Sequence, residues 1–126
     1  QLDLPSSPRW LAVRNIPFGW LLRRVDAIVH HGGAGTTAQA ARAGKPSVVV
    51  PFFGDQFFWG QRLHRAGGGP RPIPRRALTS ERLVSAIDEA LHDPRSAERA
   101  AFLGAQVRAE TGLSTAVRLI EAAFLG

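Results

Sequence analysis

Short apolar runs and stretches of helical spacing alternate along the first half of the chain. Runs of three or four consecutive apolar residues are typical of parallel strands that are covered on both faces. Apolar residues spaced by three and four positions indicate helices that bury one face. The elements predicted in this half are a strand at 10–13, a short helix or turn at 19–25, a strand at 27–30, a helix at 36–43, a strand at 47–50 and a helix at 55–66.

The second half is predicted to be helical after a proline-rich connection at 70–74, which suits a sheet edge or an extended segment. One helix starts near Thr79 or Ser80. The next starts after Asp93, an N-cap residue followed by proline, and ends at Gly112. The apolar positions expected on one face are Leu83, Val84, Ile87 and Leu91 in the first helix and Leu113, Val117, Ile120 and Phe124 in the last.

The order of these elements indicates the fold class. Strands that alternate with helices and are followed by a helical tail predict an α/β fold with a Rossmann-like parallel sheet. Three strands are fewer than a free-standing sheet of this kind usually has. We therefore expect residues 1–126 to form a single, incomplete Rossmann-like domain of a longer protein.

Composition narrows the classes of protein. The 126 residues include no cysteine, which removes disulfide frameworks and thiolate chemistry, and no apolar run long enough to cross a bilayer. A soluble, cytoplasmic protein is therefore expected. The net charge of +6 comes almost entirely from arginine, with Lys45 as the single lysine. The arginines are spread along the predicted helices without interleaved aromatic residues, so they indicate solvated faces that steer an anionic ligand, and nucleic-acid binding is the weaker alternative.

The most distinctive segment is the run His-His-Gly-Gly-Ala-Gly-Thr-Thr at 30–37, between a predicted strand and a predicted helix. Its glycines permit a tight turn with bare N–H groups, and Thr36 suits the N-cap of a helix that Gly44 ends. Unpaired N–H groups and the positive end of such a helix attract phosphate. The alternative is a turn that is rich in glycine because the crossover is tight, since the run matches neither a P-loop nor a dinucleotide fingerprint.

A histidine beside this helix start favours the phosphate interpretation. Adjacent residues of a strand point to opposite faces, so at most one of His30 and His31 faces the turn. His31 lies at the strand end next to the helix start, where a histidine can donate a hydrogen bond to a phosphate oxygen. His31 is therefore the predicted phosphate contact.

A second segment of chemical interest follows the last predicted strand. Asp55 and Gln56 lie among aromatic residues, and an acid beside an amide suits a ligand with several hydroxyl groups. The alternative is that Asp55 caps a helix while the aromatic residues fill the core. These aromatic residues are Phe52, Phe53, Phe57 and Trp59. Ligands bind at the carboxyl ends of the strands in an open α/β sheet, so both segments can face one crevice, which suits a nucleotide sugar.

Together these motifs resemble the donor-binding C-terminal half of UDP-glycosyltransferases, and of sterol 3-beta-glucosyltransferases in particular. The resemblance covers nearly the whole chain. It rests on residues 30–37, 43–46, 49–56, 58–60, 69–70 and 72–74, preceded by 15–17 and 20–21.

The resemblance implies the C-terminal domain of a two-domain GT-B enzyme that inverts the anomeric centre and uses neither a metal ion nor a cofactor besides its UDP-sugar co-substrate. It implies that His31 contacts the donor phosphates, that residues 33–36 hold the diphosphate, and that Asp55 and Gln56 bind the sugar hydroxyls. The implied donor-binding set is His31, Gly33, Ala34, Gly35, Thr36, Gln39, Asp55 and Gln56, with no metal ligand.

Three positions depart from the family pattern. Gln39 replaces a glutamate that holds both ribose hydroxyls in many relatives, so hydrogen bonds there lose their charge-assisted strength. Phe18 and Gly19 replace a His-Asp pair of the sterol enzymes, and Asn15 stands where plant relatives have a tryptophan that stacks on the base. Uridine is therefore expected to bind differently or less tightly here.

The general base of this family is a histidine of an N-terminal domain that also forms the acceptor pocket, and we expect both to lie outside this chain. None of the four histidines is expected to be catalytic, and His64 and His92 are expected on helix surfaces. The chain alone is expected to bind a UDP-sugar weakly and not to turn over. The parent enzyme is expected to transfer a hexose, glucose by resemblance, to a hydroxyl of a sterol-like or other lipophilic acceptor, and to contact a membrane through that acceptor.

A different class of function is a non-catalytic module that binds a phosphate ligand or associates with itself through exposed strand edges. UDP binding that depends on His31 and Thr36 distinguishes the enzyme part from this module. It also distinguishes the enzyme part from a nucleic-acid binder, whose affinity falls steeply with salt.

Overall fold

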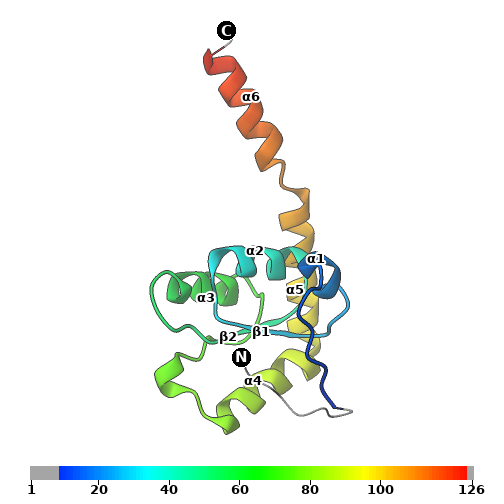
Figure 1. Cartoon of the computed structure of the whole chain (residues 1–126), viewed down its shortest axis with the longest axis vertical. Helices are drawn as coiled ribbons and strands as arrows, with labels where there is room; N and C mark the ends of the chain where they lie inside the picture. The colour runs from blue at the N-terminus through cyan, green and yellow to red at the C-terminus, as the bar shows by residue number, and fades with distance from the viewer. Residues whose placement is uncertain (1–8, 125–126) are drawn as a thin grey trace.

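Two short parallel strands lie at the centre of the computed structural model, which describes residues 9–124 (Figure 1). They are β1 (Ile28–His30) and β2 (Ser47–Val49), paired so that Val29 lies opposite Val48. Both strands lie within the ranges that the apolar runs predict. The two central strands of the prediction are therefore confirmed.

Helices cover the strands on both faces. Helix α2 (Ala34–Ala43) contacts β1, and α4 (Ser80–His92) contacts β2; Figure 1 shows α2 above and α4 below the strands. Ile28 pairs with Ser47, and Val48 belongs to the next pair along the strands. Ile28 and Val48 therefore point to opposite faces. Each is the centre of an apolar cluster. One cluster contains Leu22, Ile28 and Ala40, and the other contains Val48, Ile73, Ala86 and Ala90.

A proline-rich segment extends along the other side of β2, as predicted. The N–H of Ser47 donates to the Gly68 carbonyl at 2.8 Å, and the N–H of Ile73 donates to the Val49 carbonyl at 2.9 Å. Prolines occupy the alternate positions 70, 72 and 74, so those positions have no N–H to offer a further strand. This edge is therefore protected against strand addition, which removes one route to the self-association considered above.

The remaining helices differ in whether a side chain caps their start. A four-residue helix, α1 (Phe18–Leu21), precedes β1, α3 (Gln56–Arg65) follows β2, and a 3-10 turn, η1 (Arg75–Ala77), precedes α4. None of these three begins at a capping side chain. Asp93 caps α5 (Pro94–Ala109) by accepting from the N–H of Arg95 at 3.0 Å, which confirms its predicted role.

The last helix differs from the others. Helix α6 (Gly112–Phe124) extends away from the body of the protein, and none of its residues is buried (Figure 1). Its predicted apolar stripe is exposed, with Leu113 and Phe124 each 82 % accessible. Gly112 was predicted to end α5, but α5 ends at Ala109 and Gly112 begins α6.

Two further predictions are wrong, and a third is right only in part. Residues 10–13 form no strand, and their apolar side chains are exposed. Helix α2 begins two residues before Thr36, because Gly33 takes the extended N-cap conformation with ψ 143°. In α4 the predicted face is right in part: Leu83 and Ile87 pack against the cluster beside the small residues Ala86 and Ala90, while Val84 is 65 % exposed. No helix among residues 9–124 has the length and apolar character to span a membrane.

Candidate functional site

The turn after β1 can form only with glycine at position 32. Gly32 has φ +90°, and a Cβ there would lie 2.8 Å from Val49 Cγ1 and 2.9 Å from the Gln56 carbonyl oxygen. Its N–H donates to Nδ1 of His30 at 3.1 Å. The turn is therefore pressed against the start of α3, and this contact joins the two segments that the sequence singles out.

The start of α2 presents free N–H groups. The first hydrogen bond of the helix runs from Thr37 N to the Gly33 carbonyl at 2.9 Å, so the N–H groups of Ala34, Gly35 and Thr36 have no helical acceptor. Ala34 and Gly35 are exposed, and a Cβ on Gly35 would meet nothing within 4 Å beyond the helix itself. Three N–H groups at the positive end of a ten-residue helix, with open space before them, suit an anion.

The two histidines separate as the strand alternation predicts. His30 is half-buried, and burial, with a smaller contribution from the charge of His31, lowers its pKa to about 4. His31 is exposed, and its ring lies over Gly33, where an added Cβ would be 2.5 Å from Nε2. His31 therefore lies at the mouth of the turn, in position for its predicted phosphate contact, and His30 lies within the structure as a neutral side chain.

Two buried polar atoms in this region have no hydrogen-bond partner among the described residues: His30 Nε2 and Thr37 Oγ1. Buried polar groups are nearly always paired, so each such atom needs an explanation. Thr37 is absent from the predicted donor-binding set. Thr37 is buried and Thr36 is half-buried, and no sequence pattern distinguishes these two adjacent threonines.

The second segment is organised by Gln56. Its side chain is buried, and Oε1 accepts from the N–H of Phe52 at 2.9 Å and of Phe53 at 3.3 Å. These bonds fix the loop between β2 and α3 and orient the amide. The NH₂ of Gln56 makes no hydrogen bond with any described residue, so the amide retains its donors for a ligand.

Asp55 lies at the N-cap position of α3 but does not cap it. Its side chain accepts no backbone N–H, and Oδ2 accepts instead from the indole Nε1 of Trp59 at 3.0 Å. The carboxylate is exposed and retains acceptor capacity. The alternative in which this segment caps a helix and fills the core with aromatic residues is wrong, because Phe52 and Phe53 are 51 % and 73 % exposed.

The structure brings most of the predicted set together and sets one residue apart. His31, the residues at 33–36 and Asp55 with Gln56 all follow the carboxyl ends of the paired strands, where the two turns touch. Gln39 lies farther along α2, on a separate hollow of about 330 Å³ that Gly19, Arg23 and Arg42 also line. Gly19 and Gln39, which both depart from the family pattern, therefore line the same hollow.

Other candidate groups have structural roles. Arg108 Nη1 donates to the Arg42 carbonyl at 2.6 Å and so satisfies the end of α2. His64 is half-buried and hydrogen-bonded to the Gly69 carbonyl at 2.9 Å, unlike the surface position expected, whereas His92 is exposed beside Asp88 as expected. Among residues 9–124 no three His, Asp or Glu side chains gather as they would around a metal ion.

Comparison with known proteins gives a consistent result. Residues 2–121 match the family described as erythromycin biosynthesis protein CIII-like, C-terminal domain. The chain is 47 % identical over 111 residues to O-mycaminosyltylonolide 6-deoxyallosyltransferase of Streptomyces fradiae, covering 88 % of this chain and 26 % of that protein. It is 42 % identical over 120 residues to sterol 3-beta-glucosyltransferase of Aspergillus oryzae, covering 95 % of this chain and 8 % of that protein.

Solved structures share the architecture. The glycosyltransferase VinC, in complex with DTDP, matches 98 % of this chain and 31 % of its own with a TM-score of 0.82 and 29 % identity. The glycotransferase of kitacinnamycin matches 85 % of this chain and 28 % of its own with a TM-score of 0.76 and 34 % identity. The predicted Rossmann-like fold of a GT-B C-terminal domain is confirmed, and the chain spans about a third or less of these proteins.

Proposed function

Because the chain belongs to the family of erythromycin biosynthesis protein CIII-like C-terminal domains, we propose that it is the donor-binding part of a glycosyltransferase. The observation that carries this proposal is the close approach of Gly32 to the Gln56 carbonyl, which leaves no room for a Cβ at position 32. That approach places an open helix N-terminus with His31 next to the acid–amide pair. One end of a nucleotide sugar needs anion donors and the other needs hydroxyl partners, and this edge of the sheet offers both.

In the proposed complex the diphosphate lies against the N-terminus of α2. The free N–H groups of Ala34, Gly35 and Thr36, the Thr36 hydroxyl and the His31 ring donate to its oxygens. These donors stabilise the negative charge that develops on the leaving nucleoside diphosphate, so the transfer proceeds without a metal ion. Asp55 accepts from sugar hydroxyls and the Gln56 NH₂ donates to one, while Gln39 lies on the ribose side.

The proposed donor is a UDP-hexose, with glucose as the sugar and a lipophilic alcohol, such as a sterol, as the acceptor. A second candidate is a dTDP-deoxysugar, since a 6-deoxyallosyltransferase is 47 % identical and VinC was solved with DTDP. Both donors present the same diphosphate to α2 and differ at the base and at the sugar. In either case we propose that the acceptor pocket and the general base, and with them inversion at the anomeric centre, come from another part of the protein.

Calorimetric titration of the chain with UDP, dTDP and UDP-glucose tests this proposal. We expect weak binding of the diphosphates and a loss of about tenfold in affinity for His31→Ala and for Thr36→Ala, because each removes a hydrogen bond to a charged group. Asp55→Asn should weaken UDP-glucose and leave UDP unchanged, since its carboxylate faces only the sugar. No sugar transfer is expected from the chain alone.

His92→Ala is the matched control, because His92 is an exposed histidine far along the chain and bonded to Asp88. The proposal fails if none of the nucleotides binds, or if His31→Ala and Thr36→Ala bind as well as the control. Tighter binding of dTDP than of UDP would favour the second donor.

A further inference from the structure

Aromatic side chains gather on the outer face of α3 and its preceding loop. Phe57 and Phe58 occupy the exposed face of the helix, and Phe52 and Phe53 lie in the loop that Gln56 holds. All four are more than 40 % exposed, and Phe53 reaches 73 %. Exposed apolar side chains that occur singly need no explanation, but four phenylalanines in a seven-residue stretch indicate an interaction surface.

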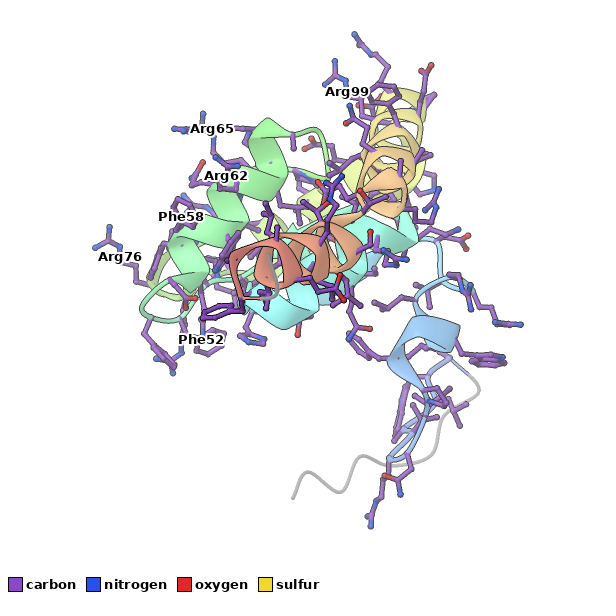
Figure 2. All side chains as sticks on the ribbon, turned by 90° about the horizontal axis from the view of Figure 1, so that it is seen from above. Phe52, Phe58, Arg62, Arg65, Arg76 and Arg99 are labelled. Carbon is purple, nitrogen blue, oxygen red and sulfur yellow. The ribbon has the colours of Figure 1, made fainter. Side chains whose placement is uncertain are left out.

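Arginines surround these rings. Figure 2 shows Arg62, Arg65 and Arg76 pointing outward on the side of the molecule that carries Phe58. The segment from 52 to 76 contains five arginines and one acidic residue, Asp55, which is bonded to Trp59. The arginines were expected to be spread along helices without aromatic neighbours, and in this segment they lie beside aromatic residues instead. We name this set the α3 surface; its members are Phe52, Phe53, Phe57, Phe58, Arg62, Arg65, Arg75 and Arg76.

The geometry within the α3 surface limits what it can bind. The guanidinium of Arg75 lies 5.5 Å from the ring centre of Phe52, and that of Arg62 lies 5.8 Å from the ring centre of Phe58. A stacking platform for nucleic-acid bases needs open ring faces, and a cation already lies over one face of Phe52 and of Phe58. A second copy of this chain is also disfavoured, because its arginines would meet these arginines.

We propose that the α3 surface binds the headgroup region of an anionic phospholipid membrane. Arginines near a membrane surface are attracted to acidic headgroups while their stems and the neighbouring rings enter the interface. Phenylalanine has no hydrogen-bonding group, so its exposure is relieved most fully in an apolar phase.

The position of the α3 surface gives this binding a consequence. Gln56 is shared, because it holds the loop of Phe52 and Phe53 and also belongs to the sugar end of the candidate donor site. A membrane bound there would lie beside the sugar end, where a lipophilic acceptor could be presented. This consequence rests on the proposed function, but the membrane binding itself does not, and the two are measured separately.

Sedimentation with vesicles tests the inference. The chain is mixed at moderate salt with vesicles of phosphatidylcholine alone or of phosphatidylcholine and phosphatidylglycerol, and the bound fraction is measured. We expect binding to the mixed vesicles only. Replacing Arg62, Arg65 and Arg76 by alanine together should weaken it about a hundredfold, since each basic residue at a membrane surface contributes about fivefold. Phe53→Ser with Phe58→Ser should weaken it about tenfold while the charge is unchanged.

The matched control replaces Arg14, Arg95 and Arg118, which are exposed elsewhere in the chain, and removes the same charge. Circular dichroism verifies that every variant is folded. The inference is overturned if the control loses as much binding as the α3 variant, if the phenylalanine variant binds unchanged, or if the chain ignores anionic vesicles. Binding to single-stranded DNA or polyglutamate that depends on the same three arginines, without vesicle binding, would also overturn it. UDP titration of each variant shows whether the donor site is intact.

Discussion

Helices α4 and α6 are both 13 residues long, and both carry an apolar stripe, yet their surroundings are opposite. Helix α4 packs against β2 through Ala86 and Ala90, whereas no residue of α6 is buried (Figure 1). An amphipathic pattern therefore shows that a helix has a face to bury, but it does not show where the partner lies. The half of the chain that contains the sheet and the candidate donor site has buried residues in its helices, whereas the described part of the chain buries no residue of α6.

The largest expected change in the free energy of unfolding comes from one of two helical glycines. Gly104 lies in the packed region, and Gly112 lies in α6. A Cβ on Gly104 of α5 would lie 2.6 Å from Cα of Gly44, so α5 would have to separate from α2, whereas a Cβ on Gly112 would meet nothing within 4 Å. Gly104→Ala should lower the free energy of unfolding by about 2–3 kcal/mol through overpacking. Gly112→Ala should leave it unchanged or raise it slightly through helix propensity.

Urea unfolding followed by circular dichroism measures both glycine variants. If Gly104→Ala and Gly112→Ala are equally stable, α5 does not pack on α2 as closely as described, and the contrast between the two regions is lost.

A smaller effect is expected from acid, again confined to the packed region. The pKa of His30 is lowered to about 4 from its usual 6.5, mainly by burial. Between these pH values the unfolded chain takes up a proton that the folded chain does not, so stability is complete above pH 6.5 and falls as the pH drops toward 4. Between pH 7 and pH 5 the loss should be roughly 1–2 kcal/mol, less than the full shift implies because the ring is only partly buried.

Urea unfolding of the wild-type chain and of His30→Gln at pH 7 and pH 5 isolates the contribution of His30 to the pH dependence of stability, because glutamine cannot titrate. The same pH dependence in both proteins would show that the imidazole of His30 is not buried in its neutral form.

Sequence patterns predicted the parts of the fold that local chemistry determines. The apolar runs gave β1 and β2, and Asp93 followed by proline gave the start of α5, because each depends on residues within a few positions. The strand at 10–13 was wrong because a strand needs a partner as well as an apolar sequence. The aromatic residues of α3 suggested burial, yet the side of the helix that faces the sheet is filled by Gly60 and Leu63, which leaves the larger rings outside.

The sequence predicted those parts of the candidate site whose positions follow from strand alternation and residue spacing. Strand alternation predicted that at most one of the two histidines faces the turn, and the structure places His31 there and His30 half-buried inside. The start of α2 was misplaced because threonine is the more common cap, but an extended glycine can cap equally well at position 33. Neither the unpaired hydroxyl of Thr37 nor the role of Gln56 in holding its own loop could be inferred, since both depend on packing between elements distant in sequence.

The central claim is that the packed region, at the open N-terminus of α2, binds the diphosphate of a nucleotide sugar. Amide resonances recorded by ¹⁵N–¹H NMR during a titration with UDP test it most directly. The account predicts that the largest shifts occur at His31 and at residues 33–36, with none in α6. Saturable binding that shifts the amides of the α3 surface or of α6, and leaves residues 33–36 unmoved, would contradict it.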